Sequence, residues 1–184
     1  MPQRLEQLKQ WLSETLSSTS YSIEPASGDA SFRRYFRVQL DGKSYIAMDA
    51  PPDKEDCHPF VAIAQAFFKL GLHVPEILHQ DMGNGFLLLT DLGSRLYLQE
   101  LNADTAERLY GDAMGALVAL QACGPGDCSL PAYDRVLLIN EMELFREWFL
   151  KQHLGLALDD NQQQQLDGIF NLLADAALEQ PVVC

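Results

Sequence analysis

A loop of small residues stands directly in front of a strand-like segment that is both aromatic and basic. The loop residues are Gly28, Asp29, Ala30 and Ser31. Arg33, Arg34 and Arg37 follow, three of the 13 basic residues in a chain of formal net charge -13. Small residues let backbone N–H groups approach an anion, and arginine neutralises it. The pattern predicts a nucleotide-phosphate site, although a hairpin turn with a charged outer face is the alternative, because one Gly-rich turn is a weak signal.

A second candidate cluster lies far from the first in the sequence. Its residues are Glu141, Glu143, Arg146, Glu147 and Trp148. A helix places Glu143, Arg146 and Glu147 on one face. Carboxylates can bind sugar hydroxyls and an indole ring can stack on a sugar. The alternative is a solvated, salt-bridged face with the tryptophan in the core.

Cysteines and histidines predict no metal site. Cys123 and Cys128 are too far apart for a CxxC pair, and the four histidines have no ligand spacing. We expect the cysteines to be reduced.

The acidic balance argues against nucleic acid and against anionic membranes as partners, because both need a basic surface. No apolar run approaches the roughly 20 residues of a membrane span. The N-terminus is charged and amphipathic and lacks the apolar centre of a signal peptide. We therefore expect a soluble, cytoplasmic protein.

Hydrophobic periodicity divides the chain into two regions of different class. The first region reads as an amphipathic helix, strands and one further helix, with a hairpin turn at Asp41-Gly42. Its last strand, Phe86 to Leu89, is continuously apolar and is expected to be buried on both faces. After Gly93 the pattern is helical. The predicted helices there span 96–101, 103–122, 134–154 and 161–177.

The motifs GDASFRRYFRV, YIAMDAPP, VPEIL, FLLLTDLG and NEMELFREWFL, in this order, resemble the aminoglycoside phosphotransferase family. They look most like its bacterial sugar kinases, which phosphorylate N-acetylmuramic acid and N-acetylglucosamine at C1 in cell-wall recycling. The resemblance implies an α+β, protein-kinase-like fold and ATP with Mg²⁺ as cofactors. It also implies a nucleotide-binding lobe over 1–90, a hinge at 91–93 and the start of a helical lobe over 94–184.

The resemblance also implies roles for particular residues. Gly28 to Ser31 match the loop that covers the ATP phosphates. Thr90, Asp91 and Leu92 match the hinge, with the Thr90 carbonyl and the Leu92 N–H holding adenine. The helix that carries Glu141, Glu143, Arg146 and Trp148 is implied to line the acceptor cleft.

The chain departs from the family pattern at the phosphate-binding lysine of the third strand. The matching place is Ala47 or Met48, depending on register, and neither is basic. The helix over 60–70 also lacks the glutamate that would pair with such a lysine. Arg33 or Arg34 is the candidate for the missing charge.

A larger departure concerns the HxDxxxxN loop and the later aspartate that position the acceptor and hold Mg²⁺ in the family. Neither is found in the sequence, and we expect the catalytic residues to lie beyond Cys184. The sequence leaves two rivals open. One is a kinase of the same fold acting on an aminoglycoside or another small alcohol, and the other is a non-catalytic nucleotide-binding module.

We predict that the 184-residue chain by itself has no measurable kinase activity. Phosphoryl transfer depends on positioning and electrostatic stabilisation by the groups this chain lacks. An assay of ATP-dependent sugar phosphorylation with the purified chain tests this. Turnover near that of an intact homologue would contradict the prediction.

Overall fold

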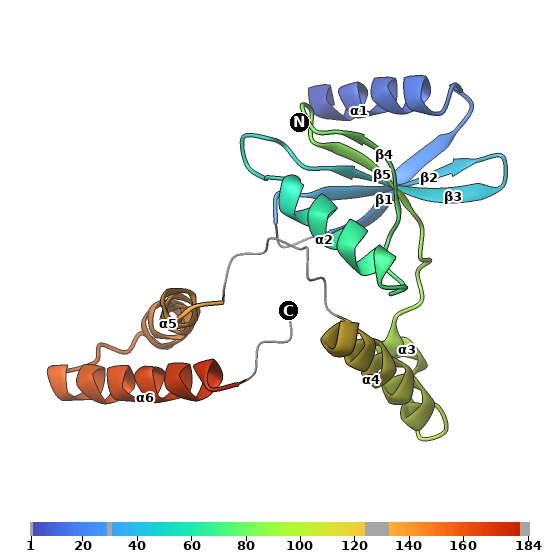
Figure 1. Ribbon diagram of the computed structural model, residues 1–184. Helices are drawn as coiled ribbons and strands as arrows, with labels where there is room; N and C mark the ends of the chain where they lie inside the picture. Colours follow the sequence, from blue (N-terminus) through green and yellow to red (C-terminus); the bar gives the residue numbers. More distant parts are fainter. Residues whose placement is uncertain (1, 29–30, 124–132, 181–184) are drawn as a thin grey trace. The chain divides into compact units, whose positions relative to one another are not determined.

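The computed structural model describes residues 2–28, 31–123 and 133–180 (Figure 1). The chain divides into two compact units, Met1–Cys128 and Ser129–Val183, and each is described by itself. The predicted boundary at the hinge over 91–93 stays a prediction.

The first unit is built on one five-stranded sheet in the order β1-β2-β3-β5-β4. The strands are β1 (Ser22–Gly28), β2 (Arg34–Leu40), β3 (Lys43–Asp49), β4 (Ile77–Asp81) and β5 (Phe86–Thr90). Every neighbouring pair is antiparallel. The predicted β2–β3 hairpin is confirmed, because Asp41 and Gly42 both have positive φ, 50° and 74°, as a two-residue hairpin turn requires. The small antiparallel lobe expected from the sequence is therefore present.

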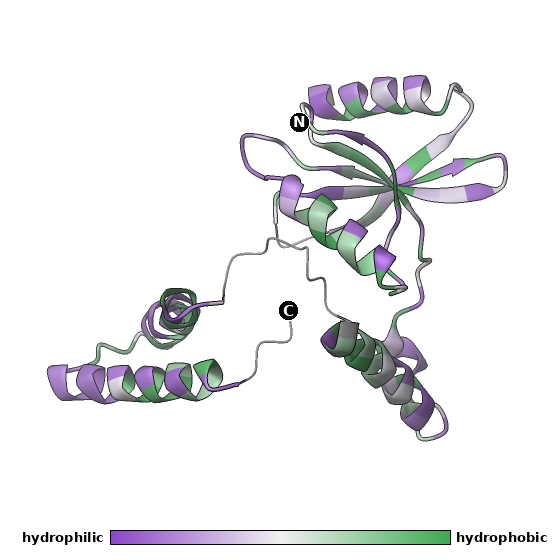
Figure 2. Ribbon diagram, in the orientation of Figure 1, coloured by the Kyte–Doolittle hydropathy of each residue, from purple (hydrophilic) through white to green (hydrophobic). Residues whose placement is uncertain are grey.

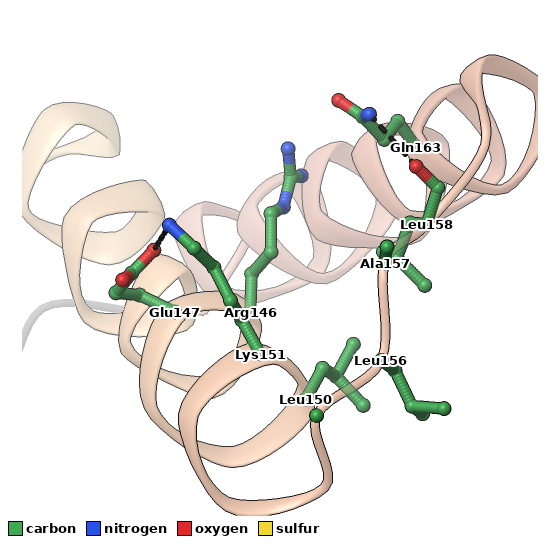
Figure 3. Close-up of a pocket in the computed structure, with 9 residues that line it drawn as sticks. Arg146, Glu147, Leu150, Lys151, Leu156, Ala157, Leu158 and Gln163 are labelled. Carbon is green, nitrogen blue, oxygen red and sulfur yellow. Dashed lines mark hydrogen bonds and ion pairs between the residues drawn. The ribbon is translucent and has the colours of Figure 1, made fainter.

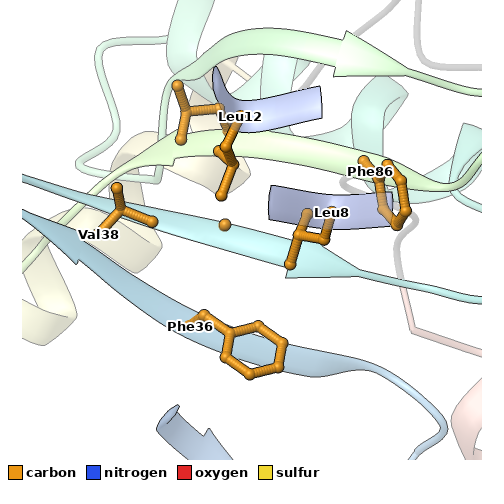
Figure 4. Packing of buried hydrophobic residues seen from close by; sticks show 7 residues of the cluster. Leu8, Leu12, Phe36, Val38 and Phe86 are labelled. Atoms are coloured by element: carbon orange, nitrogen blue, oxygen red, sulfur yellow. The ribbon is translucent and has the colours of Figure 1, made fainter. Parts of the chain in front are cut away.

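Helix α1 (Pro2–Thr15) covers one face of this sheet. Its apolar residues Leu8 and Leu12 are fully buried. They pack with the side chains that β2, β3 and β5 turn toward the helix (Figure 4). These sheet residues are Phe36, Val38, Ala47, Phe86 and Leu88.

The opposite face carries a second apolar cluster, next to helix α2 (His58–Lys69). Met48, Leu87 and Leu89 are buried there, and Phe60 and Val61 of α2 pack against them. Figure 2 shows that α2 is mostly hydrophobic along its length. Because β5 contributes to both clusters, the expectation that this strand is buried on both faces is confirmed.

A buried carboxylate ties α1 to the sheet. Asp49, at the end of β3, is fully buried and accepts hydrogen bonds of 3.0 Å from Arg4 Nε and of 3.0 Å from Arg34 Nε. Arg4 also donates to the Asn84 carbonyl at 2.8 Å. Two guanidinium groups on one carboxylate compensate for the cost of burying its charge.

The remaining described elements are helical, as predicted. They are α3 (Tyr97–Glu100), α4 (Ala106–Cys123), α5 (Arg135–Leu144), η1 (Phe145–His153) and α6 (Asp160–Leu178). The predicted helix over 134–154 continues through its length but changes to π winding at Phe145. Asp134 and Asp159 begin α5 and α6 by accepting hydrogen bonds from backbone N–H groups three residues on.

None of the helices in the described ranges is long and apolar enough to cross a membrane.

We predict that Gly85→Ala destabilises the first unit more than Gly42→Ala does. Both residues have φ near +70°, which costs a non-glycine residue roughly 1 kcal/mol. A Cβ on Gly85 would lie 1.9 Å from the Ala50 carbonyl oxygen, whereas nothing lies within 4 Å of a Cβ on Gly42. The overpacking adds about 1–3 kcal/mol to the loss. Urea unfolding of both variants measures it, and equal losses would show that the clash is relieved.

Candidate functional site

A cavity of about 490 Å³ opens beside the exit of β5 in the first unit. Its apolar walls come from Tyr35, Ile46, Phe60, Leu89 and Leu96. Residues of the segment that follows β5 line another part of it. An apolar cavity with a few convergent polar groups is the usual form of a small-molecule site, and its volume lies in the usual range for such sites.

The predicted hinge residues Thr90, Asp91 and Leu92 all line this cavity. Thr90 is fixed by Glu76 of the segment before β4: the Thr90 N–H donates to the Glu76 carbonyl at 3.0 Å, and its Oγ1 accepts from the Glu76 N–H at 3.0 Å. Leu92 is half exposed. The structure therefore brings the segment expected to hold adenine to the cavity.

Asp91 turns its carboxylate away from solvent and toward the sheet. Its side chain is 6% exposed and forms an ion pair with Arg37 of β2 at 2.7 Å. Hydrogen bonds from Arg37, then from Ser44 and the Gly93 N–H, outweigh burial and hold the pKa of Asp91 far below its usual range. Arg37, which lines the cavity, and Ser44 are contacts of Asp91 that the sequence reasoning missed, because they lie 54 and 47 residues from Asp91.

The expected phosphate loop is only partly within the described residues. Asp29 and Ala30 lie outside them. Gly28 ends β1 opposite Arg34, and Ser31 Oγ accepts a hydrogen bond of 3.1 Å from the Arg33 N–H. The phosphate role of this loop stays a prediction.

The register of β3 indicates which residue of this chain stands at the position of the family's phosphate-binding lysine. Ala47 packs in the α1 cluster, whereas Met48 lies in the cluster beside α2 together with cavity residue Ile46. Side chains alternate along a strand, so Met48 is the β3 residue that faces as the lysine would. This face therefore has a buried apolar residue at that position.

Arg33 supplies a positive charge on the α2 side. Its Nε donates to Glu55 at 3.2 Å, and its guanidinium lies 5.7 Å from the centroid of the Phe60 ring. Burial opposes its charge, but hydrogen bonds to Tyr35 and Glu55 outweigh that effect and raise the pKa of Arg33. Glu55 also accepts from the Phe32 N–H at 3.0 Å. Arg33 thus has a carboxylate partner that lies just before α2 and not within 60–70.

Arg34 lies on the opposite side of the sheet. It pairs with the buried Asp49 and its guanidinium lies 5.7 Å from the Phe36 ring in the α1 cluster. Alternation along β2 places it away from Tyr35 and Arg37, which line the cavity. Among the described residues, no contact of Arg34 supports its predicted phosphate role, so Arg33 is the stronger candidate. The same alternation puts Arg37 at the cavity.

The second unit holds a cavity of about 470 Å³ beside η1 and the start of α6 (Figure 3). Of the predicted acceptor residues, Arg146 lines it together with its neighbour Glu147. Arg146 pairs with Glu143 and with Asp167 of α6. Glu147 pairs with Lys151 at 2.9 Å. The contact with Asp167 joins this helix to α6, so it describes a packing role for Arg146.

Trp148 and Glu141 are exposed in this unit. Trp148 is 65% exposed, so the alternative that placed it in a core does not hold for the described residues. The π winding begins three residues before it, and such segments often occur at functional sites. The acceptor role of Glu141, Glu143, Arg146 and Trp148 stays a prediction.

Within 2–28, 31–123 and 133–180, no group of three or more His, Cys, Asp or Glu side chains is arranged to hold a metal ion.

The chain matches the family model described as the phosphotransferase enzyme family over residues 22–184. It is 46% identical to an N-acetylmuramate/N-acetylglucosamine kinase of Pseudomonas putida and 44% identical to one of Pseudomonas aeruginosa. Each alignment covers 98% of this chain and 56% of the relative. A relative of the same name from Neisseria meningitidis is 37% identical over 98% of this chain and 55% of its own length. The chain thus spans about half the length of these curated relatives.

A solved structure from Ralstonia eutropha, assigned to the aminoglycoside phosphotransferases, shares the fold with a TM-score of 0.54. It is 17% identical, and the match covers 81% of this chain and 48% of that one. The expected protein-kinase-like fold is confirmed.

We predict that Arg33→Ala weakens ATP binding to the complete protein by ~1–3 kcal/mol, the scale of a charge-assisted hydrogen bond. Adenosine binding changes little, because adenosine carries no phosphate for Arg33 to neutralise. Isothermal titration with the two ligands measures both effects. Unchanged ATP affinity in Arg33→Ala and in Arg34→Ala would exclude an arginine as the substitute for the lysine.

Proposed function

Because the chain belongs to the phosphotransferase enzyme family, we propose that the complete protein transfers the γ-phosphoryl group of ATP to a sugar. The acceptor is the anomeric hydroxyl of N-acetylmuramic acid or N-acetylglucosamine, as in cell-wall recycling. The observation that carries this proposal is the 46% and 44% identity to N-acetylmuramate/N-acetylglucosamine kinases over 98% of the chain. We propose the cytoplasm as its location, since ATP is available there.

The first unit supports this proposal with a site that suits ATP. The apolar walls at Ile46, Leu89 and Leu96 suit the two faces of a purine. The backbone of Thr90 and Leu92 supplies hydrogen-bonding groups for its edge. Arg33 supplies positive charge for the phosphates. Bound ATP supplies the phosphoryl group that is transferred.

Mg²⁺ is proposed as the cation that accompanies ATP, because phosphoryl transfer needs charge neutralisation by a metal ion. The described residues do not include a ligand set for it. No step of the reaction is therefore derived through the ion from these residues.

The second unit supports a sugar acceptor through its exposed aromatic side chain. Trp148 can stack on a sugar ring, and the carboxylates of Glu141 and Glu143 can accept hydrogen bonds from hydroxyls. The same carboxylates suit the cationic amines of an aminoglycoside. The two acceptor classes therefore differ in what they need from this helix: stacking for the sugar, and negative charge for the aminoglycoside.

We predict that the complete protein has a higher kcat/KM for N-acetylmuramic acid or N-acetylglucosamine than for kanamycin. The acetamido group of these two sugars is neutral, so they lack the ammonium groups that an acidic aminoglycoside site requires. Coupled measurement of ADP release with the three acceptors, at fixed saturating ATP, gives the comparison.

A higher kcat/KM for kanamycin would refute the sugar assignment while leaving the kinase fold intact. The absence of turnover with all three acceptors, in a protein that binds ATP, would favour the non-catalytic nucleotide-binding module.

A further inference from the structure

We propose that Arg37 is a positioning residue of the nucleotide site, which acts through Asp91 to hold the hinge backbone in the conformation that binds the base. The inference rests on the proposed nucleotide function and assigns a role to a residue that does not itself need to touch the ligand. Arg37, Ser44, Asp91 and Gly93 are called the hinge clamp below.

The clamp joins three parts of the first unit. Arg37 extends from β2 and donates from Nε to Asp91 Oδ2 at 2.7 Å and from Nη2 to Oδ1 at 3.3 Å. Ser44 of β3 donates its hydroxyl to the same Oδ2. The Gly93 N–H donates to Oδ1 at 2.8 Å, and the Gly93 carbonyl lies 3.4 Å from Arg37 Nη2. The segment after β5 is thereby fastened to two strands.

These contacts account for the whole acceptor capacity of the Asp91 carboxylate. Each of its oxygens has two lone pairs. Oδ2 receives Arg37 Nε and Ser44 Oγ, while Oδ1 receives Arg37 Nη2 and the Gly93 N–H. The side chain of Asp91 has no lone pair left for a ligand. Its contribution to nucleotide binding is therefore the position of the backbone on either side of it.

Because the Asp91 carboxylate is buried, its conformation depends on the positive charge of Arg37. The Asp91 side chain is 6% exposed and that of Arg37 is 22% exposed. A buried carboxylate that loses its cation is strongly unfavourable and turns toward water. Turning away from Arg37 would also break the hydrogen bond from the Gly93 N–H to Asp91 Oδ1, which helps to fix the backbone of the segment that lines the cavity. Gly93, at φ +91°, provides a turn that a side chain would strain.

The chain offers a matched control for the loss of such an arginine. Arg4 also donates to a buried carboxylate, Asp49, and to a backbone carbonyl, but it lies on the α1 face of the same sheet. Arg4→Ala therefore removes an arginine–carboxylate ion pair from the same unit without touching the cavity, although Asp49 keeps its second arginine, Arg34. An effect on nucleotide binding that is shared by both variants reports general destabilisation, whereas one confined to Arg37 reports the clamp.

The test compares Arg37→Ala with wild type and Arg4→Ala in the complete protein, by titration with adenosine, ATP and inorganic tripolyphosphate. We expect Arg37→Ala to weaken adenosine and ATP binding by the same factor, about tenfold, because the backbone must be ordered on binding. Tripolyphosphate binding is unchanged. In steady-state assays KM for ATP rises while kcat stays within about threefold. Arg4→Ala keeps wild-type affinities despite a lower unfolding midpoint.

Two milder variants test the clamp if Arg37→Ala fails to fold. Arg37→Lys keeps the charge but loses the forked pair of donors, and Ser44→Ala removes one donor only. Each should weaken adenosine binding less than Arg37→Ala and leave tripolyphosphate binding intact.

Wild-type adenosine affinity in all clamp variants overturns the inference while the proposed function stands. Equal losses in the Arg37 and Arg4 variants overturn it too. A wild-type protein that binds no adenine nucleotide overturns both the proposed function and the clamp.

Discussion

Side-chain alternation along β2 is the constraint on which the rest of the first unit depends. Arg34, Phe36 and Val38 face α1, whereas Tyr35 and Arg37 face the cavity. A shift of one residue would send the cavity residues into the α1 core and expose that core to the site. The two-residue turn at Asp41-Gly42 fixes the pairing with β3, and the same alternation then places Ala47 toward α1 and Met48 toward α2.

The ion pairs on the two faces of the sheet are alike but have different structural roles. On each, a carboxylate with little or no exposure is compensated by arginine: Asp49 by Arg4 and Arg34, and Asp91 by Arg37. The first pair joins α1 to the sheet and so contributes to the core. The second joins the hinge to the sheet and so contributes to the shape of a cavity. A buried ion pair adds little net stability. The Asp91–Arg37 pair instead fixes the geometry of the segment that lines the cavity.

Local signals in the sequence predicted the parts of the site that are local in the fold. The Asp-Gly hairpin and the apolar run from Phe86 each follow from neighbouring residues, and both are found. The hinge role of the segment after Thr90 came from the resemblance and stays a prediction. Contacts across long separations were beyond such reasoning: Arg37 meets Asp91 54 residues away, and Arg33 meets Glu55 22 residues away. The π winding at Phe145 has no periodicity signal of its own, since its residues read as an ordinary amphipathic helix. The face of the sheet on which Arg34 lies depends on the register of β2, and that register is known only from its pairing with β1 and β3.

Because position 48 holds a methionine and not a lysine, β3 supplies no positive charge for phosphates. Packing beside the base and charge for the phosphates would therefore come from different residues. In a site with that lysine, one strand carries both the wall beside the base and the charge for the phosphates. Here β3 carries the apolar residues Ile46 and Met48, while Arg33, just before β2, supplies positive charge with Glu55 as its partner. Glu55 also holds the Phe32 N–H, so this charge is coupled to the loop before β2. The hinge is held separately by Arg37 and Ser44. In the proposed nucleotide site, different contacts would therefore serve the base and the phosphates, and ligands that carry only one of the two should separate their contributions to affinity.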